Sequence, residues 1–277
     1  MTTMLTPRRP ELGSGRVTQL NVIRAEWIKL RSLRSTGFSL LAAVVIIVGL
    51  GTLFSAVRAH RFGQDNGQNG RFIEHLDPTL VSLRGVFLAQ LAIGVLGVLV
   101  ITGEYSTGMI RSSIAAVPRR SPVLFAKALV FAVVALVVTE LAAFAAFLLG
   151  QQALASTHLQ ASLSTPGAGR AIFGAGLYLT LIGLLAVGLG FLIRNTAGAI
   201  ATLFGLVLVL PLLAEALPSP YSTDVSKYLP LNAGTQIMAT TNVDPTMLGP
   251  WAGLGVTALY AVIALIGGAV MLKRKDA

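Results

Sequence analysis

The chain has 277 residues, of which 54% are hydrophobic and only 12% are charged, and its mean hydropathy is +0.77. Soluble domains usually carry about 25% charged residues, so this composition indicates a membrane protein. A net charge of +10 could suit a nucleic-acid-binding protein. Here the Lys and Arg residues lie between apolar runs, which favours a role in membrane orientation and no nucleic-acid partner. The absence of Cys excludes disulfides and thiolate metal sites.

The N-terminal region divides into two parts. Residues 1–19 are rich in Thr, Pro, Gly and Arg, which predicts a disordered cytoplasmic leader. Residues 20–35 place apolar side chains at helical spacing and basic ones mostly on other faces, which predicts an amphipathic helix lying in the membrane interface. The alternative is a cytoplasmic stub whose arginines only fix orientation. The residues expected to place the helix at the interface are Arg24, Trp27, Lys29 and Arg31.

The rest of the chain, residues 36–277, is predicted to be one all-α integral membrane domain with six transmembrane helices. A helix needs about 20 mainly apolar residues to cross the hydrocarbon core. The fourth and fifth apolar runs are separated only by Arg194-Asn195-Thr196. A tight hairpin is predicted there, because one continuous helix would be about twice as long as a bilayer requires. The six predicted spans are 37–57, 85–103, 123–150, 171–193, 197–217 and 251–272.

The distribution of Lys and Arg predicts that both termini are cytoplasmic. With that orientation, 15 of the 21 Lys and Arg residues fall in inner segments, as the positive-inside rule requires. The six on the outer side are Arg58, Arg61, Arg71, Arg84, Arg170 and Lys227.

The connection between the second and third spans carries an unusual number of charges for this chain. Glu104 lies at the C-terminal end of the second span, where the helix dipole disfavours a carboxylate, so a nearby arginine or a partner protein is expected to compensate it. Residues 106–117 then alternate apolar and polar side chains, which predicts a short amphipathic helix on the cytoplasmic surface, ended by Pro118. Lys127 is expected to extend its ammonium toward the interface.

Two polar or small-residue features lie inside the spans. Glu140 in the third span is costly at that depth, so it is either a substrate-path residue or a structural hydrogen-bonding group. The fourth span contains five glycines, for which close helix packing is the simpler interpretation and a hinge the alternative. These glycines are Gly174, Gly176, Gly183, Gly188 and Gly190.

Three stretches together resemble the permease subunits of ABC-2-type ATP-binding-cassette transporters, particularly the actinobacterial ones. They are RAEWIKLRSLRS (residues 24–35), EYSTGMIRSS followed by PRRSP (104–113 and 118–122), and YLPLNAG (228–234). The resemblance covers nearly the whole chain. Met109 departs from the pattern, because a Thr more often follows the glycine at the position of Gly108.

The resemblance implies a six-helix permease of the cell membrane that works as a homo- or heterodimer with separate ATPase subunits. It also implies that the segment 106–117 is a coupling helix that docks on the ATPase, and that short helices in 218–250 form an outer cap. No GxxxxGK[ST] motif occurs in the sequence, so ATP and Mg²⁺ are expected on the partner subunit and no cofactor on this chain. The predicted coupling residues are Glu104, Gly108, Ile110, Arg111, Ile114, Val117 and Pro118.

Function is thus expected to be transport, in the direction of export, with no enzymatic activity in this chain. The alternative is a membrane anchor or sensor that binds a cytoplasmic partner without transport. An intramembrane enzyme is the weakest hypothesis, because the spans contain no nucleophile–base pair and no metal-ligand cluster.

Overall fold

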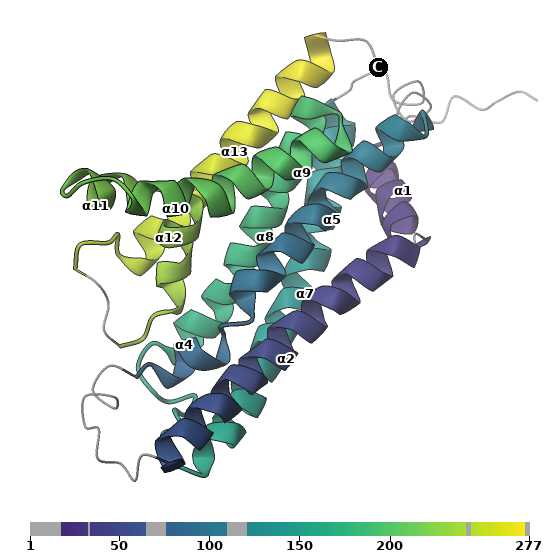
Figure 1. Ribbon diagram of the computed structural model, residues 1–277. Helices are drawn as coiled ribbons and strands as arrows, with labels where there is room; N and C mark the ends of the chain where they lie inside the picture. Colours follow the sequence, from purple (N-terminus) through teal and green to yellow (C-terminus); the bar gives the residue numbers. More distant parts are fainter. Residues whose placement is uncertain (1–17, 33, 65–75, 110–120, 242–244, 275–277) are drawn as a thin grey trace, which may run out of the picture.

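The computed structural model describes residues 18–32, 34–64, 76–109, 121–241 and 245–274, and within these ranges the chain is helical without strands (Figure 1). The first helices in chain order are α1 (Gln19–Ser32), α2 (Arg34–Gln64), α4 (Pro78–Ser82), α5 (Val86–Ser106), α7 (Ser121–Ala155) and α8 (Ala168–Ile193). The later elements are α9 (Thr196–Phe204), a π-helical turn η1 (Gly205–Val209), α10 (Leu210–Glu215), α11 (Tyr221–Ser226), α12 (Pro230–Thr235), a 3₁₀ turn η2 (Gln236–Met238) and α13 (Pro250–Arg274).

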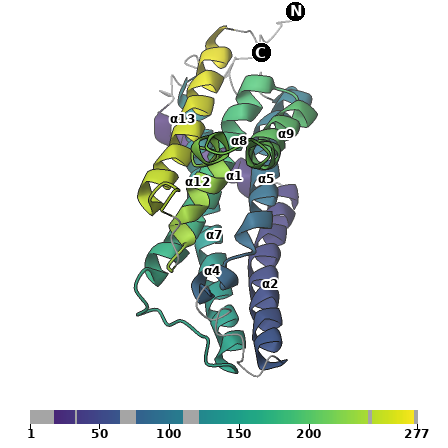
Figure 2. The same cartoon turned by 60° about the vertical axis from the view of Figure 1, so that its left-hand side comes forward.

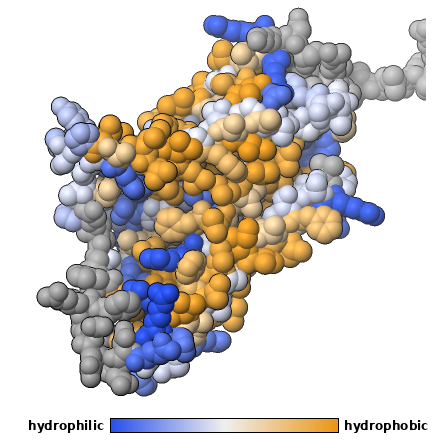
Figure 3. All heavy atoms as spheres, in the orientation of Figure 1, coloured by the Kyte–Doolittle hydropathy of each residue, from blue (hydrophilic) through white to orange (hydrophobic). Residues whose placement is uncertain are grey.

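The prediction of six spans is confirmed by length and composition. Six helical segments in the described residues are long and apolar enough to cross a membrane: 34–64, 86–106, 122–155, 168–193, 196–215 and 250–274. On the face drawn in Figure 3, apolar side chains cover most of the middle, and hydrophilic ones gather mainly toward the ends. This distribution is the one a bilayer requires, because charged groups are costly in the hydrocarbon core.

Helix α8 is the central helix of the bundle. Of its most apolar 18-residue stretch, 67% is buried inside the protein, against 22% for α2. It packs against α5, α7, α9 and α13, and in Figure 2 it lies between α13 on one side and α2 and α5 on the other.

The glycines of α8 serve this close packing, as the sequence predicted. A Cβ at Gly188 would lie 2.5 Å from the backbone carbonyl carbon of Ala264 in α13, and one at Gly183 would lie 2.5 Å from the Phe131 ring in α7. Small residues at such contacts let helix backbones approach each other in lipid.

Helices α2 and α7 continue beyond their predicted ends at residues 57 and 150. At about 1.5 Å per residue, the 35 residues of α7 exceed the thickness of the hydrocarbon core. Polar contacts stabilise the extension: the Gln151 amide nitrogen donates to the carbonyl of Pro78 at 2.9 Å, and its carbonyl oxygen accepts from the backbone N–H of Ala161 at 2.7 Å. The spans were predicted from runs of apolar residues, and such a run ends where the helix leaves the hydrocarbon core. A helical extension built from polar residues therefore could not be predicted in this way.

The predicted hairpin between the fourth and fifth spans is confirmed. Helix α8 ends at Ile193, and its C-cap residue Arg194 has a left-handed φ of 60°. Asn195 caps α9 by accepting a hydrogen bond from the backbone N–H of Gly198 at 2.8 Å. The Arg194 guanidinium donates to the carbonyl of Met271 at 3.0 Å. This bond joins the hairpin to the C-terminal end of α13.

The outer segment 218–250 contains short helices, as the resemblance implied. Helices α11 and α12 and the turn η2 follow α10, and the side chains of Ile237 and Met238 in η2 are fully buried. Gly234 of α12 packs against the Tyr178 ring of α8. In Figure 1, α9 and α10 leave the bundle toward α11, and α12 returns the chain to α13.

The described terminal helices lie at the same end of the bundle. Gln19 of α1 donates to the carbonyl of Pro122 at the start of α7 (3.1 Å), and Arg194 lies over the Tyr105 ring at the end of α5 (5.2 Å to the centroid). Because Arg194 also bonds to the end of α13, α1 and the C-terminal end of α13 share one end, which we call the inner end. The opposite end, with α4, α11 and α12, is the outer end.

Candidate functional site

A group of four charged side chains joins three helices at the inner end. Glu26 and Lys29 come from α1, Glu104 from the last turn of α5, and Lys127 from the second turn of α7. We call these four residues the charge cluster. Two ammonium groups and two carboxylates make its formal charge zero.

Lys127 is at the centre of the charge cluster. Its ammonium lies 2.6 Å from a carboxylate oxygen of Glu26 and 2.5 Å from one of Glu104. The Lys29 ammonium contacts the same two residues at 3.2 and 3.3 Å. Each carboxylate is therefore shared by two lysines, and the ion pairs connect α1, α5 and α7.

The charge cluster is largely removed from solvent. The side chains of Lys127, Glu26 and Glu104 are 2%, 7% and 12% exposed, and that of Lys29 is 30% exposed. Burial lowers the pKa of Lys29, but the attraction of Glu26 and Glu104 outweighs burial and leaves this pKa above its ordinary value. Lys29 is therefore charged at neutral pH, as the ion pairs require.

Helix α1 reaches this position because one of its faces is complementary to α7. Val22, Glu26 and Leu30 recur every four residues and are the buried side chains of α1. Val22 packs against Val123 and Ala126 of α7. Glu26 thus lies in the middle of an otherwise apolar buried stripe, directly opposite Lys127.

Several expectations need correction at this site. Glu104 was expected to be compensated by a nearby arginine or a partner protein, whereas its described partners within the chain are Lys29 and Lys127. Lys127 was expected to extend toward the interface, yet it is buried and its ammonium donates hydrogen bonds to two carboxylates. Lys29, which was expected at the interface, contacts Glu26 and Glu104 in the charge cluster, and its interface role stays a prediction. Glu26 was not recognised, although a carboxylate inside the stripe Val22–Glu26–Leu30 was a signal that could have been read.

The segment after Glu104 begins with a sharp turn. Helix α5 ends at Ser106, and Gly108 has a φ of +72°, a conformation that glycine adopts without strain. The predicted coupling residues Ile110, Arg111, Ile114, Val117 and Pro118 lie outside the described residues. Their role stays a prediction, and the structure describes the two ends of the segment that contains them.

The remaining predicted interface residues lie on the exposed face of α1. Trp27 is 46% exposed, and Arg24 and Arg31 are exposed on the same side. A helix is present over Gln19–Ser32, and α2 begins at Arg34. The contact of α1 with lipid stays a prediction.

Glu140 faces α8 inside the bundle. A Cβ at Gly176 would collide with the Glu140 carboxyl group, so the glycine makes room for it. The neighbouring Thr139 hydroxyl donates to the Gly176 carbonyl at 3.3 Å. Oε1 of Glu140 has no hydrogen-bond partner among the described residues, and its function as a path or structural residue is untested.

Asp77 is a buried carboxylate at the outer end that the sequence analysis did not single out. It caps α4 by accepting from the Leu80 N–H at 3.0 Å, and it also accepts from the N–H groups of Thr240 and Thr241 at 2.6 and 3.0 Å. The Thr240 hydroxyl donates to it at 2.8 Å. The motif Asp77-Pro78 before a short apolar run is an N-cap signal, but nothing in the sequence indicated the partners 163 residues away.

Six helices that can span a membrane, with the described terminal helices α1 and α13 reaching the same end, define a multi-pass membrane protein. The sequence matches the family model described as ABC-2 family transporter protein over residues 22–212. The chain belongs to that family. The match runs from α1 through α10 and includes all four residues of the charge cluster. No curated protein matched the sequence.

Proposed function

We propose that this chain is the membrane-spanning permease subunit of an ABC exporter and pairs with a second permease subunit. ATP hydrolysed by a separate ATPase subunit would move a substrate outward across the cell membrane. The family assignment supports a transport role and the kind of partner. The sequence contains no phosphate-binding GxxxxGK[ST] loop, which supports placing ATP and Mg²⁺ on the partner.

The observation that carries the coupling proposal is the position of the charge cluster. The segment 106–117, which we propose as the ATPase docking element, leaves α5 two residues after Glu104. The chain then enters α7, whose Lys127 bonds to that same Glu104 at 2.5 Å. A force applied to the segment would therefore act on the ends of α5 and α7 together, and through Glu26 on α1.

The proposal requires the inner end to be cytoplasmic. The chain contains no Cys, so single cysteines can be labelled without background. Thr107 and Ser164 are exposed at opposite ends of the bundle. A membrane-impermeant maleimide should label Ser164→Cys in intact cells and Thr107→Cys only after permeabilisation. The reverse pattern would refute the orientation.

The docking role is tested by Ile114→Asp. A carboxylate placed in an apolar groove of the ATPase would be buried without a partner, a change that costs several kcal/mol. The variant should insert and keep the wild-type melting temperature, because the position lies outside the spans. It should lose the co-purifying ATPase and the ATP hydrolysis that depends on the complex.

The matched control is Tyr221→Asp, which places a carboxylate at a 66% exposed position of α11 at the outer end. This variant should retain the ATPase. Wild-type ATPase stoichiometry in Ile114→Asp would refute the docking role. An ATPase that binds the wild-type protein without any ATP-dependent transport would favour the anchor or sensor function.

A further inference from the structure

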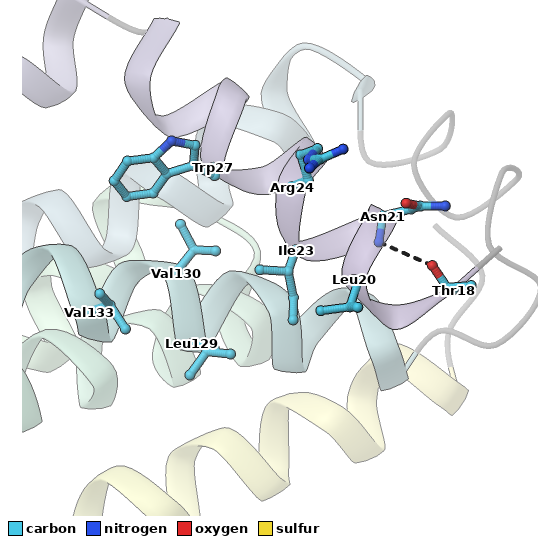
Figure 4. Close-up of a pocket in the computed structure, with 9 residues that line it drawn as sticks. All are labelled: Thr18, Leu20, Asn21, Ile23, Arg24, Trp27, Leu129, Val130 and Val133. Carbon is cyan, nitrogen blue, oxygen red and sulfur yellow. Dashed lines mark hydrogen bonds between the residues drawn. The ribbon is translucent and has the colours of Figure 1, made fainter.

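An apolar groove runs between α1 and α7 at the inner end. It has a volume of about 550 Å³, which is within the range of about 300–1,000 Å³ found for ligand pockets. Leu20, Ile23 and Trp27 of α1 face Leu129 and Val133 of α7 across it (Figure 4). The Arg24 side chain lies at the rim and points away from α7 (Figure 4).

A second groove lies on the other side of Trp27. It has a volume of about 350 Å³, is lined by Leu30, Leu40 and Val134, and has Arg31 and Arg34 at its rim. Trp27 lines both grooves. The indole therefore separates two apolar channels, each with arginine at its edge.

The rim is positively charged. Arg24 and Arg31 are seven residues apart and so lie on one face of α1, about 10 Å from each other along the axis. In the part of the chain that the structure describes, neither forms a salt bridge. The carboxylate of α1, Glu26, is held by lysines in the charge cluster, which leaves the groove rim without a described acidic group.

The larger groove opens onto a strip of α7 that faces away from the protein. Leu129, Val133, Val137 and Leu141 follow one another every four residues and are 38%, 50%, 53% and 67% exposed. Because the chain is a multi-pass membrane protein, an exposed apolar strip on a spanning helix suits contact with lipid hydrocarbon. An acyl chain can thus continue from the bilayer into the groove without crossing a polar barrier.

We infer that this surface binds an anionic phospholipid of the inner leaflet. One acyl chain lies in the groove between α1 and α7, and the phosphate accepts hydrogen bonds from Arg24 and Arg31, whose planar guanidinium groups suit phosphate oxygens. The Trp27 ring, which separates the two channels, would then lie near the headgroup level, a position that tryptophan favours. A second copy of the chain would leave the arginines without an acidic partner, whereas a phospholipid supplies both the apolar and the anionic part. The inference rests on the membrane location and, for the choice of leaflet, on the proposed cytoplasmic position of the inner end; it is independent of ATPase docking.

The two tryptophans of the chain make a direct test possible. Trp27 lies at the inner end and Trp251 at the outer end, so in Trp251→Phe the fluorescence reports on Trp27 only. The purified full chain is reconstituted in vesicles of phosphatidylcholine, and brominated-chain phosphatidylglycerol or brominated-chain phosphatidylcholine is added as the quencher. We expect brominated phosphatidylglycerol to quench Trp27 at several-fold lower mole fraction.

Arginine variants then locate the headgroup. Removing one charge near an anionic lipid weakens its association on the order of fivefold. In the Trp251→Phe background, Arg24→Gln and Arg31→Gln should each lower the preference for phosphatidylglycerol by about this factor. The matched control Arg61→Gln, at an exposed arginine of the outer end, should leave the preference unchanged.

Three results would overturn the inference. Equal quenching by the two lipids would show that no anionic lipid is selected. A preference that survives Arg24→Gln and Arg31→Gln would place the site elsewhere. If neither lipid quenched the fluorescence of Trp27, the groove would be covered by protein and not by lipid. As an internal reference, Trp27→Phe leaves only Trp251, which should be quenched equally by both lipids.

Discussion

The inner and outer ends of the bundle each depend on a largely buried carboxylate that joins distant parts of the chain, but the partners differ in kind. At the inner end, Glu104 bonds to the ammonium groups of Lys29 and Lys127. At the outer end, Asp77 bonds to the backbone N–H groups of Leu80, Thr240 and Thr241 and to one hydroxyl. The carboxylate at the inner end is therefore stabilised by ion pairs with lysines, and the one at the outer end mainly by hydrogen bonds from backbone N–H groups.

The difference matters because a buried charge is stable only while it is compensated. In the charge cluster, the loss of one ion leaves its partners with an uncompensated charge in a dry environment. Around Asp77, the loss of the carboxylate leaves neutral N–H groups, each of which costs less when unsatisfied. The inner end should therefore be the more sensitive of the two to a single substitution.

The largest effect is expected for Lys127→Met. The substitution keeps most of the side-chain volume but leaves Glu26 and Glu104 with Lys29 as their described partner. Breaking a buried ion pair in this way costs about 3–5 kcal/mol. The melting temperature of the purified protein in detergent should fall clearly, and α1 should become accessible to protease.

The control for this prediction removes a carboxylate as well. Lys127→Met combined with Glu26→Gln restores the charge balance with Lys29 and Glu104, so the double variant should be more stable than Lys127→Met alone. A double variant that is less stable than the single one by the full cost of Glu26→Gln would show that the two residues do not interact.

The sequence predicted the parts of the fold that depend on local composition. The six spans follow from apolar runs, α1 follows from its helical spacing, and the 194–196 hairpin follows from a length argument. The short helices of 218–250 followed only from the family resemblance. Each of these predictions needs only residues that are close in the sequence or a familiar pattern.

The sequence did not predict which polar groups meet. Glu26 and Lys127 are 101 residues apart, and Asp77 and Thr240 are 163 apart. Such pairs are fixed by the packing of α1 on α7 and of η2 on α8, which no local pattern encodes. The extension of α7 to Ala155 was missed for the same reason, since it depends on Gln151 reaching Pro78 and Ala161.

A smaller effect is expected for Asp77→Ala. The variant loses the N-cap of α4, which is worth about 1 kcal/mol, and leaves the N–H groups of Thr240 and Thr241 without their acceptor. The total loss should be about 2 kcal/mol, less than for Lys127→Met. Amide hydrogen exchange at Thr240 and Thr241 should accelerate while exchange in α1 stays unchanged.

Asp77→Asn separates the two roles of the carboxylate. The amide oxygen can still accept from Leu80, but its NH₂ group cannot accept from the Thr240 and Thr241 backbones. In this variant the amides of α4 should remain protected from hydrogen exchange, and only those of Thr240 and Thr241 should exchange faster. If exchange accelerated equally in α4 and at Thr240 and Thr241, the two carboxylate oxygens of Asp77 would not have the separate roles inferred here.

The smallest effect is expected where the outer end has an ion pair of its own. Lys227 and Asp224 lie 2.8 Å apart on α11 and its C-cap, but the Asp224 side chain is 61% exposed. The hydrogen bond that the Lys227 ammonium donates to Asp224 raises the pKa of Lys227, so Lys227 keeps its charge at neutral pH and loses it only at strongly basic pH. Water solvates both groups when the pair is broken, and exposed pairs of this kind contribute little to stability. Asp224→Asn should therefore leave the melting temperature unchanged, at low and at high salt. If it destabilised the protein as much as Lys127→Met, burial would not be the property that distinguishes the charge cluster, and the contrast between the two ends would fail.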